Sequence, residues 1–307
     1  MNRKPTQARI WLALVTVYIL WGSTYLGIHW AEATIPPLLM SGVRFLIAGA
    51  ALFLWRYPSA RRAFRGPTPK HWRAALIIGA ALILGGNGGV ALAERSVPSG
   101  VTAVIVAMTP LWMALIDRFG FKRQLNGWTW AGIIIGFAGV ALLIGSPGSG
   151  RIDPVGAVIL VVGSLSWASG SIYSREATLP QDSSLGIGME MLAGGACLCV
   201  VSVVSGEAFR LHPAHVTALS LLSFLYLIVF GAIVGFSAYL WLLRVAPTSR
   251  VATYAYVNPI VAVLLGAAVG HEPVTTRTIA AGAVIVAGVA LIVANARAQA
   301  GEPEAVN

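Results

Sequence analysis

The chain has 307 residues, of which 57% are hydrophobic and only 10% are charged, and its formal net charge is +10. Soluble domains carry about 25% charged residues, so this composition excludes an ordinary soluble protein and indicates a surface that faces lipid. A basic charge also suits nucleic-acid binding, but the basic loops of a membrane protein account for it here, and we expect no nucleic-acid partner.

Apolar runs of about 20 residues between short polar breaks predict membrane-spanning helices. Prolines stand at or just before many of these runs, where the missing N–H of proline costs little. In chain order, the ten predicted spans lie near residues 10–30, 35–55, 73–93, 98–117, 128–146, 154–174, 185–205, 217–242, 250–270 and 275–295.

The loop charges predict an orientation. With the N-terminus in the cytoplasm, the cytoplasmic segments hold 16 Lys and Arg residues and the opposite side holds 4. Cytoplasmic loops of membrane proteins are enriched in Lys and Arg. Because a miscounted helix would mix the two sets of loops and erase this bias, we expect both termini in the cytoplasm.

The sequence also contains an internal repeat. Residues 97–116 align with residues 246–265 at an offset of 149, and the WGS motif at 21–23 matches WAS at 167–169 at an offset of 146. The matches keep one order and a nearly constant offset. They predict two related halves of five spans each.

A half with an odd number of spans places its successor in the membrane upside down, and such inverted repeats are a common plan of transporters. Two equivalent halves can exchange conformations and so open a central site to either side. We predict an all-α integral membrane protein of ten transmembrane helices in two inverted five-helix repeats around a central cavity. The expected parts are residues 1–148, residues 149–297 and a cytoplasmic tail, 298–307.

Several motifs resemble those of the EamA-type drug/metabolite transporters, and they cover the whole chain in order. They are Leu20-Trp21-Gly22-Ser23, Arg44-Phe45, Ala91 to Gly100, Pro110, Gly132 to Leu143, Trp167-Ala168 and Tyr256-Val257-Asn258-Pro259. The chain looks closest to the YedA/YddG-like bacterial inner-membrane exporters, some of which export aromatic and other amino acids. The resemblance implies a helical basket with its cavity among the first, third, fourth, sixth, eighth and ninth spans.

Two charged residues fall inside predicted spans. Arg44 lies roughly 13 Å into its helix, from the rise per residue, and Glu190 occupies the repeat-equivalent position. Buried charges in a membrane are costly and usually paired or functional. Either the two form a structural ion pair, or Arg44 meets a substrate carboxylate while Glu190 meets an amine or a coupling proton, or one or both reach the headgroups. Glu94 and Asp117, near span ends, are expected to be solvated or to serve helix packing.

Asn87 stands among four glycines in Gly85-Gly86-Asn87-Gly88-Gly89. Either the glycines let the helix unwind, which would make the amide a good ligand for a zwitterion, or they serve close helix packing.

Pro110 and Pro259 are repeat-equivalent prolines within spans. Each frees a carbonyl and permits a kink, and we interpret them as hinges, with a static kink as the alternative. Asn258, beside Pro259, either satisfies the freed carbonyl or faces the cavity.

Aromatic and hydroxyl side chains complete the predicted cavity. Trp21 and Trp167 lie well inside their spans at repeat-equivalent positions. Small-ligand sites are mostly apolar with a few polar groups, so we predict that these residues line the cavity; the alternative is a lipid-facing or packing role. The further predicted lining residues are Tyr18, Ser171, Tyr239 and Tyr254.

An intramembrane enzyme is the rival class. Ser169 would need a partner base within hydrogen-bond reach to act as a nucleophile, and all five histidines lie at span ends or in loops. Cys197 and Cys199 point to nearly opposite faces of a helix. We predict no catalytic residue, no metal site and no cofactor.

We therefore predict an alternating-access transporter of the bacterial inner membrane that exports small amphipathic metabolites, foremost amino acids including aromatic ones. Phosphorylated substrates would need several basic groups, and only Arg44 is available within a span. A multidrug or other metabolite permease of the same fold is the alternative. The expected partners are the small-molecule substrate and the lipid bilayer. We expect a monomer; the alternative is a dimer that packs through the GxxxG pair Gly132 and Gly136.

Overall fold

The computed structural model describes residues 6–63, 66–122, 124–144 and 153–301. Within these ranges the chain is helical and contains no β-strand. The predicted boundary between the halves, at residues 148 and 149, and residues 302–307 of the predicted tail lie outside the described residues.

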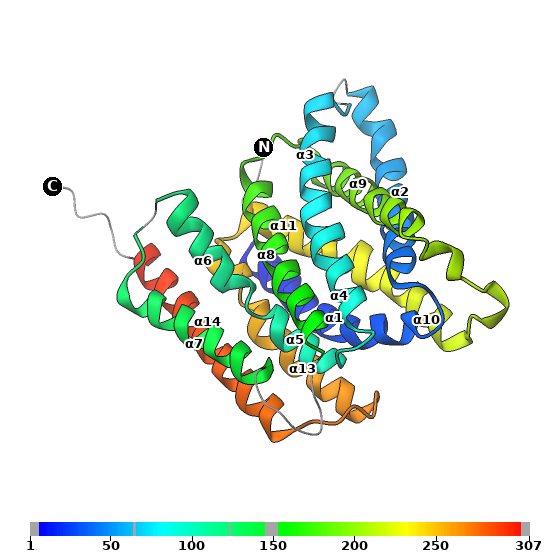
Figure 1. The fold of residues 1–307 in the computed structure, drawn as a ribbon. Coiled ribbons are helices and arrows are strands. Elements are labelled where there is room, and N and C mark those ends of the chain that lie inside the picture. Colours follow the sequence, from blue (N-terminus) through cyan, green and yellow to red (C-terminus); the bar gives the residue numbers. More distant parts are fainter. Residues whose placement is uncertain (1–5, 64–65, 123, 145–152, 302–307) are drawn as a thin grey trace.

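Figure 1 shows the arrangement of the helices. The first half contains α1 (Gln7–Glu32), α2 (Pro37–Arg62), α3 (Pro69–Gly79), the π-helix η1 (Ala80–Asn87), α4 (Gly88–Ala93), α5 (Ser99–Val106), α6 (Thr109–Gly120) and α7 (Gly127–Ile144). The rest contains α8 (Pro154–Glu176), α9 (Ser183–Val204), the 3₁₀ turns η2 (Ala208–Arg210) and η3 (Pro213–His215), α10 (Ala218–Tyr226), the π-helix η4 (Leu227–Phe236), α11 (Ser237–Val245), α12 (Thr248–Val251), α13 (Tyr254–Ala268) and α14 (Thr276–Gly301).

Apolar helices account for the predicted spans. Seven helical segments of the described chain are long and apolar enough to cross a membrane: Gln7–Glu32, Pro37–Arg62, Pro69–Ala93, Ser99–Gly120, Pro154–Glu176, Ser183–Val204 and Ala218–Val245. The other three predicted spans correspond to shorter apolar helices, Gly127–Leu142, Val257–Ala268 and Thr276–Ile292. The prediction of an all-helical membrane protein is therefore confirmed for the described residues.

Local capping explains where several helices begin. The hydroxyl of Thr68 accepts a hydrogen bond from the backbone N–H of His71, and Nδ1 of the His71 ring accepts one from the Thr68 N–H. This capping box starts α3 before the predicted residue 73. Asp153 caps α8. A hydrogen bond from the Ser96 hydroxyl, aided by the N–H of Gly156, lowers the pKa of this exposed carboxyl. Such caps satisfy N–H groups that have no partner within the helix.

Two of the spans contain a π-helix, which is wider than an α-helix, and two others contain a turn that interrupts the helix. The π-helices η1 and η4 begin at residues 80 and 227, which are 147 positions apart. Turns at residues 107–108 and 252–253 separate α5 from α6 and α12 from α13. Irregular turns of this kind are frequent at functional sites and hinges, and here both kinds occur once in each half.

The most extensive helix contacts join α2 to α9 and α7 to α14, and Figure 1 shows α7 and α14 side by side, away from α2 and α9. A Cβ on Gly42 would lie 3.1 Å from the Gly195 carbonyl oxygen, and one on Gly49 would lie 2.9 Å from the Gly188 carbonyl oxygen. Because Gly188 and Gly195 follow Gly42 and Gly49 by 146 residues, these contacts are reciprocal. Small residues let helix backbones approach this closely.

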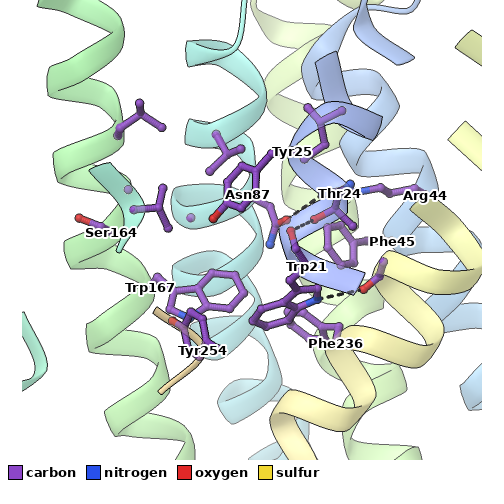
Figure 2. Close-up of a pocket in the computed structure, with 17 residues that line it drawn as sticks. Trp21, Thr24, Tyr25, Arg44, Phe45, Asn87, Ser164, Trp167, Phe236 and Tyr254 are labelled. Atoms are coloured by element: carbon purple, nitrogen blue, oxygen red, sulfur yellow. Dashed lines mark hydrogen bonds between the residues drawn. The ribbon is translucent and has the colours of Figure 1, made fainter. Parts of the chain in front are cut away.

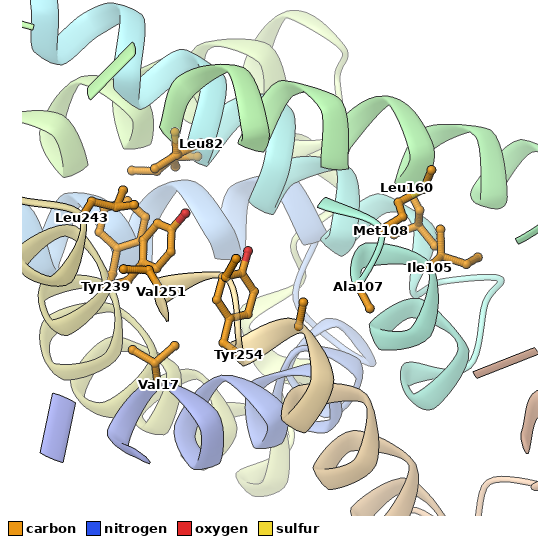
Figure 3. Packing of buried hydrophobic residues seen from close by; sticks show 14 of the residues in the cluster. Val17, Leu82, Ile105, Ala107, Met108, Leu160, Tyr239, Leu243, Val251 and Tyr254 are labelled. Atoms are coloured by element: carbon orange, nitrogen blue, oxygen red, sulfur yellow. The ribbon is translucent and has the colours of Figure 1, made fainter. Parts of the chain in front are cut away.

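The apolar core runs between these helix pairs. Tyr239, Phe236, Leu82 and Met108 are almost completely buried in it, and Figure 3 shows Tyr239 and Tyr254 within this packing. The core therefore surrounds the central pocket described next with side chains from both halves of the chain.

Candidate functional site

A pocket lies among the helices, with about 700 Å³ of empty space including its open mouth. Its walls come from α1, α2, η1, α4, α5, α8, η4 and α13 (Figure 2). The lining residues are Trp21, Thr24, Tyr25, Ile28, Arg44, Phe45, Gly86, Asn87, Val90, Val106, Leu160, Gly163, Ser164, Trp167, Gly231, Phe236 and Tyr254.

Aromatic rings gather at one end of the pocket (Figure 2). The rings of Trp21 and Trp167 meet edge to face, with centroids 5.4 Å apart. Tyr254 lies 5.7 Å from Trp21, and Phe236 lies 6.1 Å from Trp167. Edge-to-face pairs bring the positive rim of one ring to the negative face of another, so these rings form an ordered apolar surface for a ligand.

Glycines make room for both tryptophans. A Cβ on Gly86 would lie 2.6 Å from the Trp167 ring, and one on Gly235 would lie 2.7 Å from Nε1 of Trp21. Gly86 and Gly235 belong to η1 and η4, respectively. The glycines of the π-helices thus set how closely the rings approach.

Hydrogen bonds hold the tryptophans in place. Nε1 of Trp167 donates to the Tyr239 hydroxyl at 3.0 Å, and that hydroxyl lies 2.7 Å from the Ser171 hydroxyl. Nε1 of Trp21 donates to the Gly231 carbonyl at 3.3 Å. Tyr239 and Ser171 were predicted to line the cavity, but they support Trp167 from outside the lining set.

Arg44 is the single basic residue of the pocket lining and is only 3% exposed. Its Nη2 donates to Oδ1 of Asn87 at 2.7 Å, its guanidinium carbon lies 4.7 Å from the Phe45 ring centroid, and its Nε has no hydrogen-bond partner. A guanidinium with free donors in an apolar pocket can bind a carboxylate through two parallel hydrogen bonds.

Asn87 is held by the π-helix. Its Nδ2 donates to the carbonyl of Leu82 at 3.3 Å, which leaves its oxygen for Arg44. The glycines around it do not unwind the helix; they pack closely, since a Cβ on Gly85 would collide with Ser166. Of the two alternatives for this segment, close packing is the one observed.

Glu190 does not pair with Arg44. Its carboxylate is fully buried and lies 3.9 Å from Nη2 of Arg244. It is also absent from the pocket lining. Repeat equivalence placed Arg44 and Glu190 at the same depth, but the geometry gives them different partners, so it excludes the ion pair among the three alternatives for these charges.

Tyr18 and Asn258 connect α1 to α13 instead of lining the pocket. The Tyr18 hydroxyl is hydrogen-bonded to the Thr253 hydroxyl. The Thr253 hydroxyl in turn donates to the Arg250 carbonyl at 2.6 Å. With its nitrogen facing the acceptors, the Asn258 amide donates to the carbonyls of Tyr254 at 3.2 Å and Tyr18 at 3.1 Å. Both residues tie α1 to the segment around the α12–α13 break.

The predicted hinge prolines have different surroundings. Pro110 lies in the first turn of α6, directly after the break at residues 107–108, whereas Pro259 lies inside α13. A proline in a first turn costs little, so the irregular backbone in the first half lies just before the proline.

Sequence reasoning missed several lining residues, among them Phe236, and it missed Glu94. Phe236 lines the pocket at the position equivalent to Asn87, 149 residues later, so the repeat could have identified it. Glu94 was expected to be solvated or to serve packing, yet it is 1% exposed and neither carboxylate oxygen has a hydrogen-bond partner. Its spacing of four residues from Val90 and seven from Asn87 was the available signal.

The described residues contain no group of three or more His, Cys, Asp or Glu side chains arranged to hold a metal ion. A pocket with one guanidinium, one amide and an aromatic surface suits reversible binding of a small amphipathic molecule.

The EamA-like transporter family matches the chain twice, at residues 8–145 and 154–294. The inner membrane transporter YedA of Escherichia coli strain K12 is 41% identical over 286 residues, which cover 91% of this chain and 89% of that protein. A second protein of that strain, named "Probable amino-acid metabolite efflux pump", is 24% identical and covers 86% of this chain and 87% of its own length.

A solved crystal structure has the same fold, with a TM-score of 0.67 and 19% identity, over 96% of this chain and 99% of that one. The family and the named relatives are transporters, which agrees with the prediction that the protein is not an enzyme. Because the family matches nearly the whole chain and a close relative shares 41% of its residues, the chain belongs to the EamA-like transporter family.

Proposed function

We propose that the protein is an alternating-access transporter that exports small zwitterionic metabolites, foremost amino acids with aromatic side chains, across the bacterial inner membrane. The observation that carries this proposal is the pocket itself, in which Arg44 and Asn87 lie beyond an aromatic surface. The aromatic rings would receive an apolar side chain and the free donors of Arg44 a carboxylate.

Contacts between equivalent residues support two inverted halves of five spans. Trp21 meets Trp167, its equivalent at an offset of 146. The glycine contacts of α2 with α9 are reciprocal, and the family matches the chain once in each half. Contacts of this kind are expected around a two-fold axis in the membrane plane, with the substrate site on it. We take 1–148, 149–297 and 298–307 as the two repeats and the tail.

The charge of the pocket favours a zwitterion. Phosphorylated substrates need several cations, and Arg44 is the single one in the lining. A neutral drug without an acceptor group would leave the free donors of the guanidinium without a hydrogen-bond partner, which is unfavourable. Amino acids satisfy both the aromatic surface and the cation.

The names of the relatives support the direction and location of transport. One is an inner membrane transporter and another is named for efflux of amino-acid metabolites. The loop charges favour cytoplasmic termini. In this proposal the protein acts as a monomer, because its GxxxG glycine Gly132 is already used within the chain, against Gly288.

The breaks supply places for the halves to bend. The α5–α6 turn lies just before Pro110, and the α12–α13 turn lies a few residues before Pro259. We assign these segments as the hinges of alternating access. The Tyr18–Thr253 hydrogen bond ties α1 to the second hinge, so its breakage would accompany opening on that side.

Counterflow into proteoliposomes tests the function. The purified full chain is reconstituted with an excess of unlabelled L-phenylalanine inside, and uptake of labelled L-phenylalanine, L-tryptophan, L-leucine and L-glutamate is measured. We expect accumulation of the aromatic amino acids above that of L-glutamate, whose second carboxylate has no cation in the pocket lining. Absence of counterflow for every amino acid would overturn the proposal and leave the fold unaffected.

The aromatic surface makes a separate prediction. Trp167→Ala removes the ring that meets Trp21 and is expected to weaken L-tryptophan binding about 30-fold, the effect of losing about 2 kcal/mol at a central aromatic contact. Trp167→Phe keeps a ring and loses only the hydrogen bond to Tyr239, so it should bind within about threefold of wild type. Isothermal titration calorimetry measures both, and equal losses would contradict a role for the ring itself.

A further inference from the structure

Beyond the lining residues, the helices of the pocket carry a group of buried polar side chains, which we call the polar chamber. We define this polar chamber by the side chains of Glu32, Ser41, Glu94, Ser99 and Thr102. None of their side-chain oxygens has a hydrogen-bond partner in the described chain. Buried polar atoms are almost always hydrogen-bonded, so these five unpartnered side chains need a partner from outside the described chain.

Helical register places the chamber next to the pocket. Glu32 follows the lining residue Ile28 by four positions on α1, and Glu94 follows the lining residue Val90 by four. Residues four apart lie on one helix face, one turn from each other. The chamber therefore extends the wall by about one turn.

The same register holds on the helices that begin at this end. Thr102 precedes the lining residue Val106 by four positions on α5, and Ser41 precedes Arg44 by three on α2. The helices α1 and α4 end here and α2 and α5 begin here, so all four extend the pocket in the same direction.

Charges around the chamber do not cancel. The carboxylate of Glu94 is close enough to Arg44, Glu32 and Glu272 for their charges to interact, and it also acts on Tyr25. Two carboxylates, Glu32 and Glu272, and one cation, Arg44, therefore act on Glu94, while Arg95 acts on Glu32.

Two of the other nearby carboxylates have hydrogen-bond partners. Glu272 accepts the N–H groups of Ser99 at 3.1 Å and Gly100 at 3.2 Å, where it caps α5. Glu207 caps α2 through the N–H of Leu38 at 2.9 Å and accepts from the Ser202 hydroxyl. Charge interactions of Glu32 reach Arg95, Arg44 and Glu207. Glu94, by contrast, caps no helix, and its carboxylate accepts no hydrogen bond within the described chain.

We propose that Glu94 accepts the ammonium group of the transported zwitterion while Arg44 holds its carboxylate, and that a proton occupies Glu94 when the site is empty. This inference rests on the proposed function. An unpaired carboxylate is unfavourable in a buried site, and either an ammonium group or a proton neutralises it. On binding, the O–H bond of the Glu94 carboxyl breaks, the proton passes to water, and the ammonium group takes its place with three N–H donors.

One substrate molecule and one proton therefore compete for the same carboxylate. A proton bound from one side of the membrane would displace the substrate, and a substrate from the other side would displace the proton. This is antiport of a zwitterion against a proton, and it assigns to Glu94 the coupling role that the sequence suggested for Glu190.

Binding of three related probes tests the proposal on the purified full chain. L-phenylalanine carries both charges, phenethylamine carries only the ammonium group, and 3-phenylpropionate carries only the carboxylate. Calorimetry at a series of pH values measures each affinity in wild type, Glu94→Gln, Glu94→Asp and Glu190→Gln. Glu190→Gln is the matched control, because it also removes a buried carboxylate but one that lies beside Arg244.

In wild type, the affinity for L-phenylalanine and phenethylamine is expected to fall by up to about tenfold per pH unit on acidification, because one proton competes with each ammonium group. Glu94→Gln should abolish this dependence and weaken both ammonium probes about 30-fold, while 3-phenylpropionate changes less than about threefold. Glu94→Asp and Glu190→Gln should keep the pH dependence.

The outcomes separate the two proposals. If wild type binds L-phenylalanine but Glu94→Gln keeps its pH dependence and its preference for ammonium probes, the role of Glu94 is wrong and the amino-acid function stands. If wild type binds phenethylamine but not L-phenylalanine, and Glu94→Gln removes that binding, the ammonium site stands and the amino-acid function fails. If wild type binds none of the probes, both fail. Should Glu94→Gln not fold, a pH-independent Glu94→Asp would overturn the proposal.

Discussion

Arg44→Ala is expected to lower amino-acid counterflow about 100-fold. The substitution removes the group proposed to bind the substrate carboxylate, leaves the Asn87 oxygen without its 2.7 Å partner and removes the cation that acts on Glu94. Truncating one member of a buried, hydrogen-bonded charge pair costs about 2–5 kcal/mol, and about 2.7 kcal/mol corresponds to this factor. Initial rates in proteoliposomes measure the loss.

Two variants separate binding of the substrate carboxylate by the guanidinium from the general effect of removing a positive charge. Arg44→Lys keeps the positive charge but not the planar fork of donors, so it should recover only part of the activity. Arg175→Ala removes an exposed arginine near the end of α8 and should leave the rate within about twofold, since exposed charges contribute little. A rate for Arg44→Ala equal to that of wild type would show that the substrate does not use the guanidinium.

Gly288→Ala is expected to destabilise the packing of α7 on α14 and to lower the amount of folded protein severely. The new Cβ would lie 2.6 Å from the Gly132 carbonyl oxygen and 2.6 Å from the Gly136 nitrogen. Both are backbone atoms, so the collision cannot be relieved by a side-chain rotation. Overpacking costs about 1–3 kcal/mol where side chains give way, and more is expected here. The midpoint of thermal unfolding in detergent measures the effect.

Gly282→Ala is the matched control on the same helix. Its Cβ would meet only Val104, at 3.6 Å, an ordinary van der Waals contact. Both substitutions change helix propensity equally, so the difference between them isolates the collision. If Gly288→Ala unfolds at the same temperature as Gly282→Ala, the close approach of α7 and α14 is not required for stability.

Helical spans were predictable because each is a local property of the chain. An apolar run long enough to cross a bilayer is helical whatever its neighbours, since no other conformation of a single segment satisfies its own backbone in lipid. The Trp21–Trp167 contact was partly accessible as well, because the repeat identified the two positions as equivalent. It did not give their separation, which depends on how far each residue lies from the axis relating the halves.

Arg44 and Glu190 show that contacts cannot be inferred from repeat equivalence alone. They are as equivalent as the two tryptophans, yet Glu190 lies beside Arg244 and Arg44 beside Asn87. Equivalence in sequence means symmetric placement, and only residues close to the axis also become neighbours.

Glu94 shows a second limit. Its place at the end of a span suggested a solvated or packing role, but α5 begins five residues later and the charges of Glu32 and Glu272 act on it from other parts of the chain. The π-helices were also beyond prediction, because they accompany tertiary contacts such as that of Gly86 with Trp167.

The reciprocal glycine contacts between α2 and α9 have an energetic consequence for a protein that changes conformation. Gly42 touches the equivalent of Gly49, and Gly49 touches the equivalent of Gly42. In the proposed exchange of conformations between the halves, each glycine contact is replaced by its own counterpart, so these contacts favour neither state. The preference between the two faces of the membrane then comes from what has no counterpart, namely the charged residues around the pocket, and from the gradients of the molecules they bind.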